Sequence, residues 1–195
     1  MQLEKYQPQK RTFRVQQTDS IFKVLILGDV SVGKTKLLES IHNYSSFKKN
    51  LRSKFYFPIR TSFIDFYLIK LFPKRIFYFL DFKGGKKDMQ ILKLIQKSIL
   101  NGVSLIIFTF SFDITKSFES IFDQNGWYEM LGEEIEKLNI PTIFVGNKRD
   151  KKSGFRSESA RKFCNKLPTS KGFITTSAIT SEGINDLVLE LRKIF

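Results

Sequence analysis

The chain has 195 residues, of which 33 are Lys or Arg and 19 are Asp or Glu, so its formal net charge is +14. A domain of this size buries about 70% of its unfolded surface and needs no disulfide or structural metal to fold. The single cysteine, Cys164, excludes an internal disulfide, and no apolar run reaches the length of a transmembrane helix. We therefore expect one domain in a reducing, cytoplasmic compartment rather than a secreted or membrane-spanning protein.

The positive charge is unevenly distributed along the chain. Residues 23–97 hold 16 basic and 5 acidic side chains, whereas residues 113–136 hold one basic and seven acidic ones. A strongly basic surface favours an acidic partner such as nucleic acid, an anionic membrane or an acidic protein. The distribution places that partner on the front half of the chain.

Hydrophobic periodicity and turn residues predict an alternation of strands and helices. Residues 1–20 lack periodicity and are expected to form a flexible basic arm ahead of a domain at 21–195. The predicted strands are 21–27, 61–71, 75–81, 103–110, 140–145 and 172–176. The predicted helices are 34–44, 88–100, 116–139 in one or two pieces, 157–167 and 184–195, with a basic loop at 45–60. This order predicts an α/β fold with a six-stranded, mostly parallel sheet flanked by about five helices, and ligands at the carboxyl ends of the strands.

The loop between the first strand and the first helix reads Gly-Asp-Val-Ser-Val-Gly-Lys-Thr over residues 28–35. This is the phosphate-loop pattern Gly-x4-Gly-Lys-Thr, in which glycines let the backbone wrap a phosphate and N–H groups point at the anion. Lys34 is expected to reach the β- and γ-phosphates, and the Thr35 hydroxyl to coordinate Mg²⁺. The phosphate-binding residues predicted here are Asp29, Val30, Ser31, Val32, Gly33, Lys34 and Thr35.

A second, weaker signal follows the third predicted strand. Asp81 ends that strand, and Gly84 comes three residues later. A carboxylate at a strand end can hold Mg²⁺, usually through water, and the N–H of a glycine can approach a γ-phosphate. On its own, Asp-x-x-Gly is more often an ordinary turn.

Two further loops point to a guanine base. Residues 147–150 read Asn-Lys-Arg-Asp after one predicted strand, and residues 176–178 read Thr-Ser-Ala after the last strand. The Asp150 carboxylate would accept two N–H bonds that guanine offers and adenine does not. Asn147 would bond the base and tether the loops, and the Lys148 stem would cover the ring. A backbone N–H of the 176–178 loop would bond the guanine carbonyl.

These four motifs occur in order, each at the end of a predicted strand, and together they resemble the Ras-like small GTPases, with the Rab branch most similar. Residues 61–66, Thr-Ser-Phe-Ile-Asp-Phe, are similar to the Rab pattern Thr-Ile-Gly-Ile-Asp-Phe around the first switch. Residues 112–118 and Trp127 also resemble Rab sequences. The resemblance covers residues 21–195 and implies a P-loop G domain there.

The resemblance also implies roles for single residues. Thr61 would complete the Mg²⁺ shell when a γ-phosphate is present, beside Thr35 and Asp81, and Lys34 and Thr61 would be the catalytic residues that the chain retains. Phe47 is a candidate for the aromatic ring that stacks on the base, with an anchor in the core as an equal alternative. The guanine-binding residues would be Asn147, Lys148, Asp150, Ser177 and Ala178.

Two departures from the family affect hydrolysis. The family segment Asp-x-Ala-Gly-Gln-Glu reads Asp-Phe-Lys-Gly-Gly-Lys over residues 81–86, so Gly85 replaces the glutamine that orients the attacking water. Val30 stands where the family has a small residue, and its branched side chain should crowd that water. Because phosphoryl transfer depends on positioning and charge stabilisation, both changes predict slow hydrolysis.

Other departures affect partners. Thr35 and Thr61 are 26 residues apart, and the basic residues between them include Lys48, Lys49, Arg52, Lys54 and Arg60. We expect either a solvated loop or a surface for an acidic effector or membrane. Leu80 replaces the tryptophan of Rab proteins, so the usual effector-facing aromatic patch is altered. No cysteine lies near the last residue, so a prenyl anchor is not expected on this chain.

We therefore expect a Rab-like switch that binds GTP and GDP with Mg²⁺, hydrolyses GTP slowly and acts in vesicle or membrane traffic. The alternative is a nucleotide-binding scaffold with little or no hydrolysis. Expected partners are effector and exchange-factor proteins at the switch segments, and an anionic membrane or acidic protein at the basic face. We expect a cytoplasmic monomer that can sit on the cytosolic face of a membrane. A nucleic-acid partner is not expected, because no RNA-binding module is recognisable.

Overall fold

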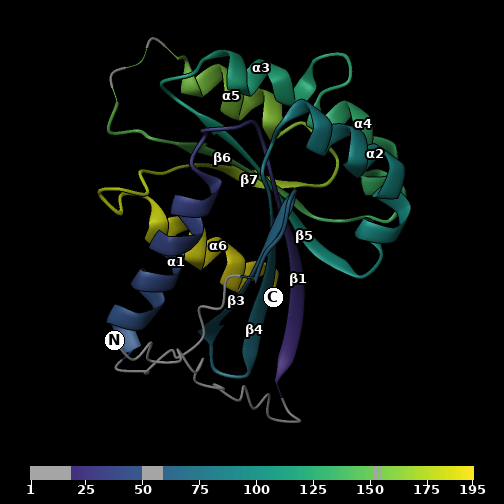
Figure 1. The fold of residues 1–195 in the computed structure, drawn as a ribbon. Coiled ribbons are helices and arrows are strands. Elements are labelled where there is room, and N and C mark those ends of the chain that lie inside the picture. Colours follow the sequence, from purple (N-terminus) through teal and green to yellow (C-terminus); the bar gives the residue numbers. More distant parts are fainter. Residues whose placement is uncertain (1–18, 50–58, 152, 154) are drawn as a thin grey trace, which may run out of the picture.

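The computed structural model describes residues 19–49, 59–151, 153 and 155–195, with the backbone alone for residues 45–49 and 59–60. Within these residues a central sheet carries helices on both faces (Figure 1). The strands are β1 (Ser20–Leu27), β2 (Ile59–Arg60), β3 (Ile64–Phe72), β4 (Arg75–Phe82), β5 (Val103–Ser111), β6 (Thr142–Asn147) and β7 (Ser170–Thr175). The helices are α1 (Lys34–Lys49), α2 (Lys86–Leu100), α3 (Lys116–Phe122), α4 (Trp127–Lys137), α5 (Ser157–Cys164) and α6 (Ile184–Ile194).

The sheet has the order β2-β3-β4-β1-β5-β6-β7. β1 pairs in parallel with β4 and β5, and β5, β6 and β7 continue the parallel part, while β3 runs antiparallel to β4 and β2. The predicted six-stranded, mostly parallel sheet is therefore confirmed. The two-residue strand β2 adds a short seventh strand at one edge. Because β1, β4, β6 and β7 run in the same direction, the loops that follow them meet along one edge of the sheet.

Several helix ends differ from the prediction, since α2 begins at Lys86 instead of residue 88 and α5 ends at Cys164 instead of residue 167. α1 continues to Lys49 instead of ending near residue 44, so part of the expected 45–60 loop is helical. Residues 45–49 contain neither Gly nor Pro, and nothing in them stops a helix. The region 116–139, predicted in one or two pieces, forms two helices, because Asn125 has a φ of +66° and a Cβ at Gly126 would lie 2.5 Å from the Ser120 carbonyl oxygen.

Two apolar layers hold the helices to the sheet. α1 and α6 cover one face, with Leu37 and Leu191 among the fully buried side chains there. α2, α3, α4 and α5 cover the other face, around Phe108, Phe144 and Trp127. Figure 1 shows this division, with α1 and α6 on one side of the strands. β1 is buried on both faces, which explains its continuous apolar run from 24 to 27. The loop after β1 is thus anchored from both sides.

Candidate functional site

The phosphate loop joins β1 to α1 and contains two glycines, Gly28 and Gly33. Gly33 has a φ of +92°, and a Cβ there would lie 2.5 Å from Asn147 Nδ2. Lys34 begins α1, so the first N–H groups of that helix face the loop. The buried Lys34 ammonium donates hydrogen bonds to the carbonyl oxygens of Gly28 (2.9 Å) and Asp29 (2.7 Å). The loop backbone therefore binds the Lys34 ammonium itself. A bound phosphate would compete with these carbonyl oxygens for the ammonium.

Burial sets the charge state of this lysine. Burial lowers the pKa of Lys34 to about 8, although Asp81, Asp29 and Asp88 act in the opposite direction. Bound phosphate would add negative charge beside the ammonium and favour its charged form. The site is thus suited to an anion more than to an uncharged ligand.

Thr35 and Asp81 lie together at the ends of α1 and β4. The Thr35 hydroxyl donates to Asp81 Oδ2 at 2.5 Å. Asp81 Oδ1 is buried and has no hydrogen-bond partner among the described residues. Burial raises the pKa of this carboxyl to about 6, against the opposing hydrogen bond from Thr35 and charge of Lys34. A buried carboxylate oxygen that lacks a partner costs free energy, which a cation would recover.

Mg²⁺ fits this pair, because a carboxylate and a hydroxyl are the hard oxygen donors that it prefers. Thr35 and Asp81 would hold it, and the bound ion would neutralise phosphate charge. Both residues line a cavity of about 280 Å³. Its lining residues are Ser31, Gly33, Lys34, Thr35, Lys36, Asp65, Asp81, Phe82 and Lys83.

Thr61, the third predicted metal residue, is not brought to this pair. Its hydroxyl donates to the carbonyl oxygen of Ile64, and the Ile64 N–H donates back to that hydroxyl at 3.0 Å. The Thr61 N–H is bonded to Asp65 Oδ1 at 3.2 Å. The residue is exposed and closes a local turn. Thr61 would have to leave this turn to reach a metal ion.

Residues 81–86, which the family resemblance makes the second switch, begin directly against the phosphate loop. Gly84 has a φ of +87°, and a Cβ there would lie 2.3 Å from the Gly28 carbonyl oxygen. Gly85 is the N-cap of α2, and its N–H donates to Asp88 Oδ2 at 2.7 Å. Val30, 56% exposed, faces a second cavity of about 470 Å³ that Gly84 and Gly85 also line. Val30 and the two glycines therefore share one cavity beside the phosphate loop, which Ser120, Gln124 and Asn125 also line.

Asn147 connects three loops at the opposite end of the site. Its Nδ2 donates to the Val32 carbonyl oxygen at 3.0 Å, and its Oδ1 accepts from Thr176 Oγ1 (3.2 Å) and from the Ala178 N–H (3.1 Å). The side chain is 1% exposed. The predicted tethering role thus agrees with the contacts, which occupy both ends of the amide.

The neighbouring residues are held in a similar way. Ser177 Oγ donates to Asp150 Oδ1 at 2.6 Å, which orients the exposed carboxylate. Lys148 has a φ of +60° and forms an ion pair with Asp113 at 3.1 Å. These contacts hold the Asp150 carboxylate and the Lys148 stem in place without a bound base.

Sequence patterns missed several contacts of the site. The side chain of Asp29, predicted at the phosphate, accepts hydrogen bonds from Ser120 Oγ (2.5 Å) and Trp127 Nε1 (3.0 Å), and so ties the loop to α3 and α4. The Lys83 ammonium donates to the Thr61 carbonyl oxygen. The positive charge of Lys83 was visible in the sequence. The partners of Asp29 were not predictable, because they lie 91 and 98 residues away along the chain.

Phe47 belongs to α1 by its backbone, and its side chain lies outside the described residues. The side chains of the basic segment, from Lys48 through Arg60, also lie outside them.

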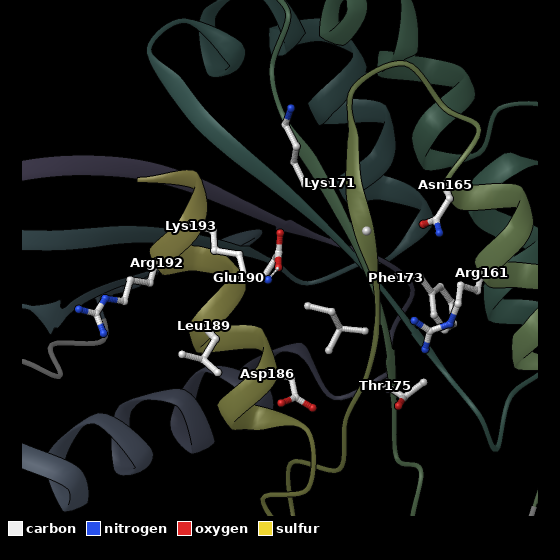
Figure 2. Close-up of a pocket in the computed structure, with 12 residues that line it drawn as sticks. Arg161, Asn165, Lys171, Phe173, Thr175, Asp186, Leu189, Glu190, Arg192 and Lys193 are labelled. Atoms are coloured by element: carbon white, nitrogen blue, oxygen red, sulfur yellow. Dashed lines mark hydrogen bonds and ion pairs between the residues drawn. The ribbon is translucent and has the colours of Figure 1, made fainter.

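A larger cavity of about 730 Å³ lies between α5, β7 and α6 (Figure 2). Its walls carry charges of both signs, among them Arg161, Lys171 and Asp186. None of the predicted site residues lines it. The larger volume is therefore not at the phosphate loop, where the chemistry-bearing side chains converge.

Comparison with known proteins identifies the family. The family model of the Ras family matches residues 23–194. The chain is 27% identical over 177 residues to the Ras-related protein RabO of Dictyostelium discoideum, which covers 86% of this chain and 75% of that protein. It is also 27% identical over 133 residues to an ADP-ribosylation factor-like protein of the same organism, over 68% of this chain and 69% of that protein. With the P-loop fold and the order of its four motifs, the chain belongs to the Ras family of small GTPases.

Proposed function

We propose that this protein is a Rab-like GTP/GDP switch of membrane traffic that binds guanine nucleotide with Mg²⁺ and hydrolyses GTP slowly. The observation that supports slow hydrolysis is the pairing of Gly85 with Val30 at one cavity beside the phosphate loop, where a residue without a side chain replaces the glutamine of the family pattern. Specificity for guanine is supported by the hydrogen bonds that orient Asn147 and Asp150. Residues 21–195 form the G domain in this proposal, with residues 1–20 as an arm.

A nucleotide-binding scaffold is the second candidate, and the same two residues favour it. If hydrolysis is absent, the protein would remain in the GTP state and act through its surface alone. The hydrogen bond between Thr35 and Asp81, the pair that would hold Mg²⁺, supports a working switch instead. The rate of hydrolysis separates the two functions.

The partner surface that we propose is the switch face. On α2 the exposed side chains include Lys86, Lys93 and Lys97, and beside them Leu94 is 85% exposed. The acidic residue in the first turn of α2, Asp88, accepts a hydrogen bond from the Gly85 N–H. This basic surface suits an effector or exchange factor with an acidic face, or an anionic membrane, rather than a nucleic-acid groove. No helix in the described residues is long and apolar enough to cross a membrane. We propose a cytoplasmic monomer that reaches the cytosolic face of a membrane by surface contact.

The nucleotide that copurifies with the protein tests this function first. The protein is purified in Mg²⁺, denatured, and the released nucleotide is identified by chromatography. Retained GTP is the expected result, and retained GDP would argue for ordinary turnover. Single-turnover hydrolysis of radiolabelled GTP then gives the rate, and a rate equal to that of ordinary small GTPases would refute slow hydrolysis. Excess ATP that displaces bound GTP would refute guanine specificity.

A further inference from the structure

Lys83 connects the two switch segments through three separate atoms. Its N–H donates to the Phe63 carbonyl oxygen at 3.1 Å, and its own carbonyl oxygen accepts from Lys34 Nζ at 3.5 Å. Its ammonium donates to the Thr61 carbonyl oxygen and lies 4.0 Å from Asp65 Oδ1. A lysine therefore stands at the junction of the phosphate loop and both switches.

The same side chain lines the cavity that holds Thr35 and Asp81. Within this cavity, Lys83 favours the charged form of Asp81, as Lys34 does, and Asp65 opposes it. Two ammonium groups thus act on the carboxylate that would face Mg²⁺.

The Lys83 side chain is exposed enough to reach a ligand. It is 44% exposed, and its stem has four carbons. Its bond to the Thr61 carbonyl oxygen joins two surface segments. A lysine ammonium binds phosphate as a compact point charge without the fixed geometry that an arginine requires.

We propose that Lys83 is a resident cation of the phosphate site, which contacts phosphate oxygens of the bound nucleotide and makes its retention less dependent on Mg²⁺. This inference rests on the proposed binding of guanine nucleotide. The ammonium supplies positive charge beside Asp81 from within the chain, so removal of Mg²⁺ leaves the phosphates partly neutralised. Without Lys83, the phosphates would still have the Lys34 ammonium but would lack this second cation.

The release of a fluorescent GDP analogue tests this role. Protein loaded with the analogue is chased with excess GDP, and the release rate is measured in millimolar Mg²⁺ and again in EDTA. The ratio of these two rates is the Mg²⁺ dependence. In Lys83→Ala and Lys83→Met we expect that ratio to be on the order of tenfold larger than in the wild-type protein, since a charge-assisted bond to phosphate is lost. Lys83→Met keeps most of the aliphatic stem, so its result does not depend on lost packing.

Two further variants separate a local ammonium from net charge. Lys83→Arg keeps a positive charge that also binds phosphate, so it should retain the wild-type ratio within about threefold. Lys93→Ala removes one exposed positive charge from the middle of α2 and should leave the ratio unchanged. An equal ratio in wild type, Lys83→Ala and Lys83→Met overturns the proposal, as does an increase in Lys93→Ala as large as that in Lys83→Ala. Failure of every protein to retain the analogue even in Mg²⁺ would instead contradict the proposed nucleotide binding.

Discussion

The two ends of the candidate site are built differently. At the base end, Asn147 and Ser177 are buried, and their side chains bond to neighbouring loops of the protein. At the phosphate end, Lys34 is bonded to the carbonyl oxygens of its own loop, and Asp81 Oδ1 has no partner in the described part of the chain. The base end is therefore held in place by the protein's own contacts, whereas at the phosphate end one buried carboxylate oxygen lacks a partner among the described residues.

The departures from the family follow the same division. The residues that would select guanine match the family pattern, while Val30, Lys83 and Gly85 depart from it around the phosphates. A recognition site that is held by internal hydrogen bonds loses little entropy on binding. A phosphate end that lacks the water-orienting side chain can still bind anions. The departures from the family pattern therefore concentrate at the phosphate end, while the guanine motif is kept.

The largest effect is expected from Asp150→Ala, which removes the carboxylate at the base end. Two charge-assisted hydrogen bonds to guanine would be lost, so the preference for GDP over ADP should fall on the order of 10³-fold. Displacement of a fluorescent GDP analogue by GDP and by ADP measures that preference. Asp186→Ala removes an exposed carboxylate of α6 and serves as the control. An unchanged preference in Asp150→Ala would show that the base end does not read guanine.

Asp81→Asn should stabilise the nucleotide-free protein at pH 7 while weakening its use of Mg²⁺. Burial raises the pKa of this carboxyl from 3.8 to about 6, so the charged form destabilises the fold by about 2–3 kcal/mol at pH 7. Asparagine keeps an acceptor for Thr35 and carries no charge.

The pH dependence gives the sign of that effect. Because the folded state holds the Asp81 proton more tightly than the unfolded state, the stabilising effect of this proton is present at low pH and is lost as the pH rises through about 6. The advantage of Asp81→Asn should therefore shrink between pH 7 and pH 5. Urea unfolding in EDTA at both pH values measures it, with Asp186→Asn as the exposed control. A variant less stable than wild type at pH 7 would contradict this account of the phosphate end.

Gly85→Gln tests whether the missing side chain limits hydrolysis. Gly85 has φ −75° and ψ 159°, which any residue adopts, and an added Cβ would meet only the end of the Asp88 side chain at 2.9 Å. We expect single-turnover hydrolysis to rise about tenfold when Val30→Gly accompanies the change, and less when Val30 remains. Gly85→Ala is the control, because it adds a Cβ without an amide. Equal rates for alanine and glutamine at this position would place the limitation elsewhere.

Much of the fold was predictable because its signals are local. The apolar run of β1, the glycines of the phosphate loop and the break near Gly126 are each encoded within a few residues. The continuation of α1 beyond residue 44 was missed, although neither Gly nor Pro interrupts residues 45–49. Motif order identified which loops would meet, because parallel strands bring their carboxyl ends to one edge.

The orientation of side chains in the site was not predictable in the same way. Asp29 belongs to the phosphate-loop motif, yet its carboxylate bonds Ser120 and Trp127. Lys83 was visible only as a positive charge, and its bond to Thr61 depends on how two strands pair. Such rotamers follow from contacts between residues distant in sequence, which periodicity and spacing do not report.

Thr61→Ala should have the smallest effect and concerns the first switch. Its hydroxyl is engaged in the turn with Ile64, so any bond gained with Mg²⁺ in the GTP state is offset by the bond lost in that turn. We expect GDP affinity to be unchanged and GTP affinity to fall by only about threefold. The corresponding change in binding free energy is smaller than that of one ordinary hydrogen bond. Competition of GDP and GTP for the labelled nucleotide site measures both values, and Ser62→Ala, at the exposed neighbouring position, is the matched control. A loss of GTP affinity above tenfold, with GDP affinity preserved, would mean that the turn opens at little cost. In that case the phosphate end would respond to the γ-phosphate as fully as an ordinary switch does, and the contrast with the preformed base end would concern hydrolysis alone.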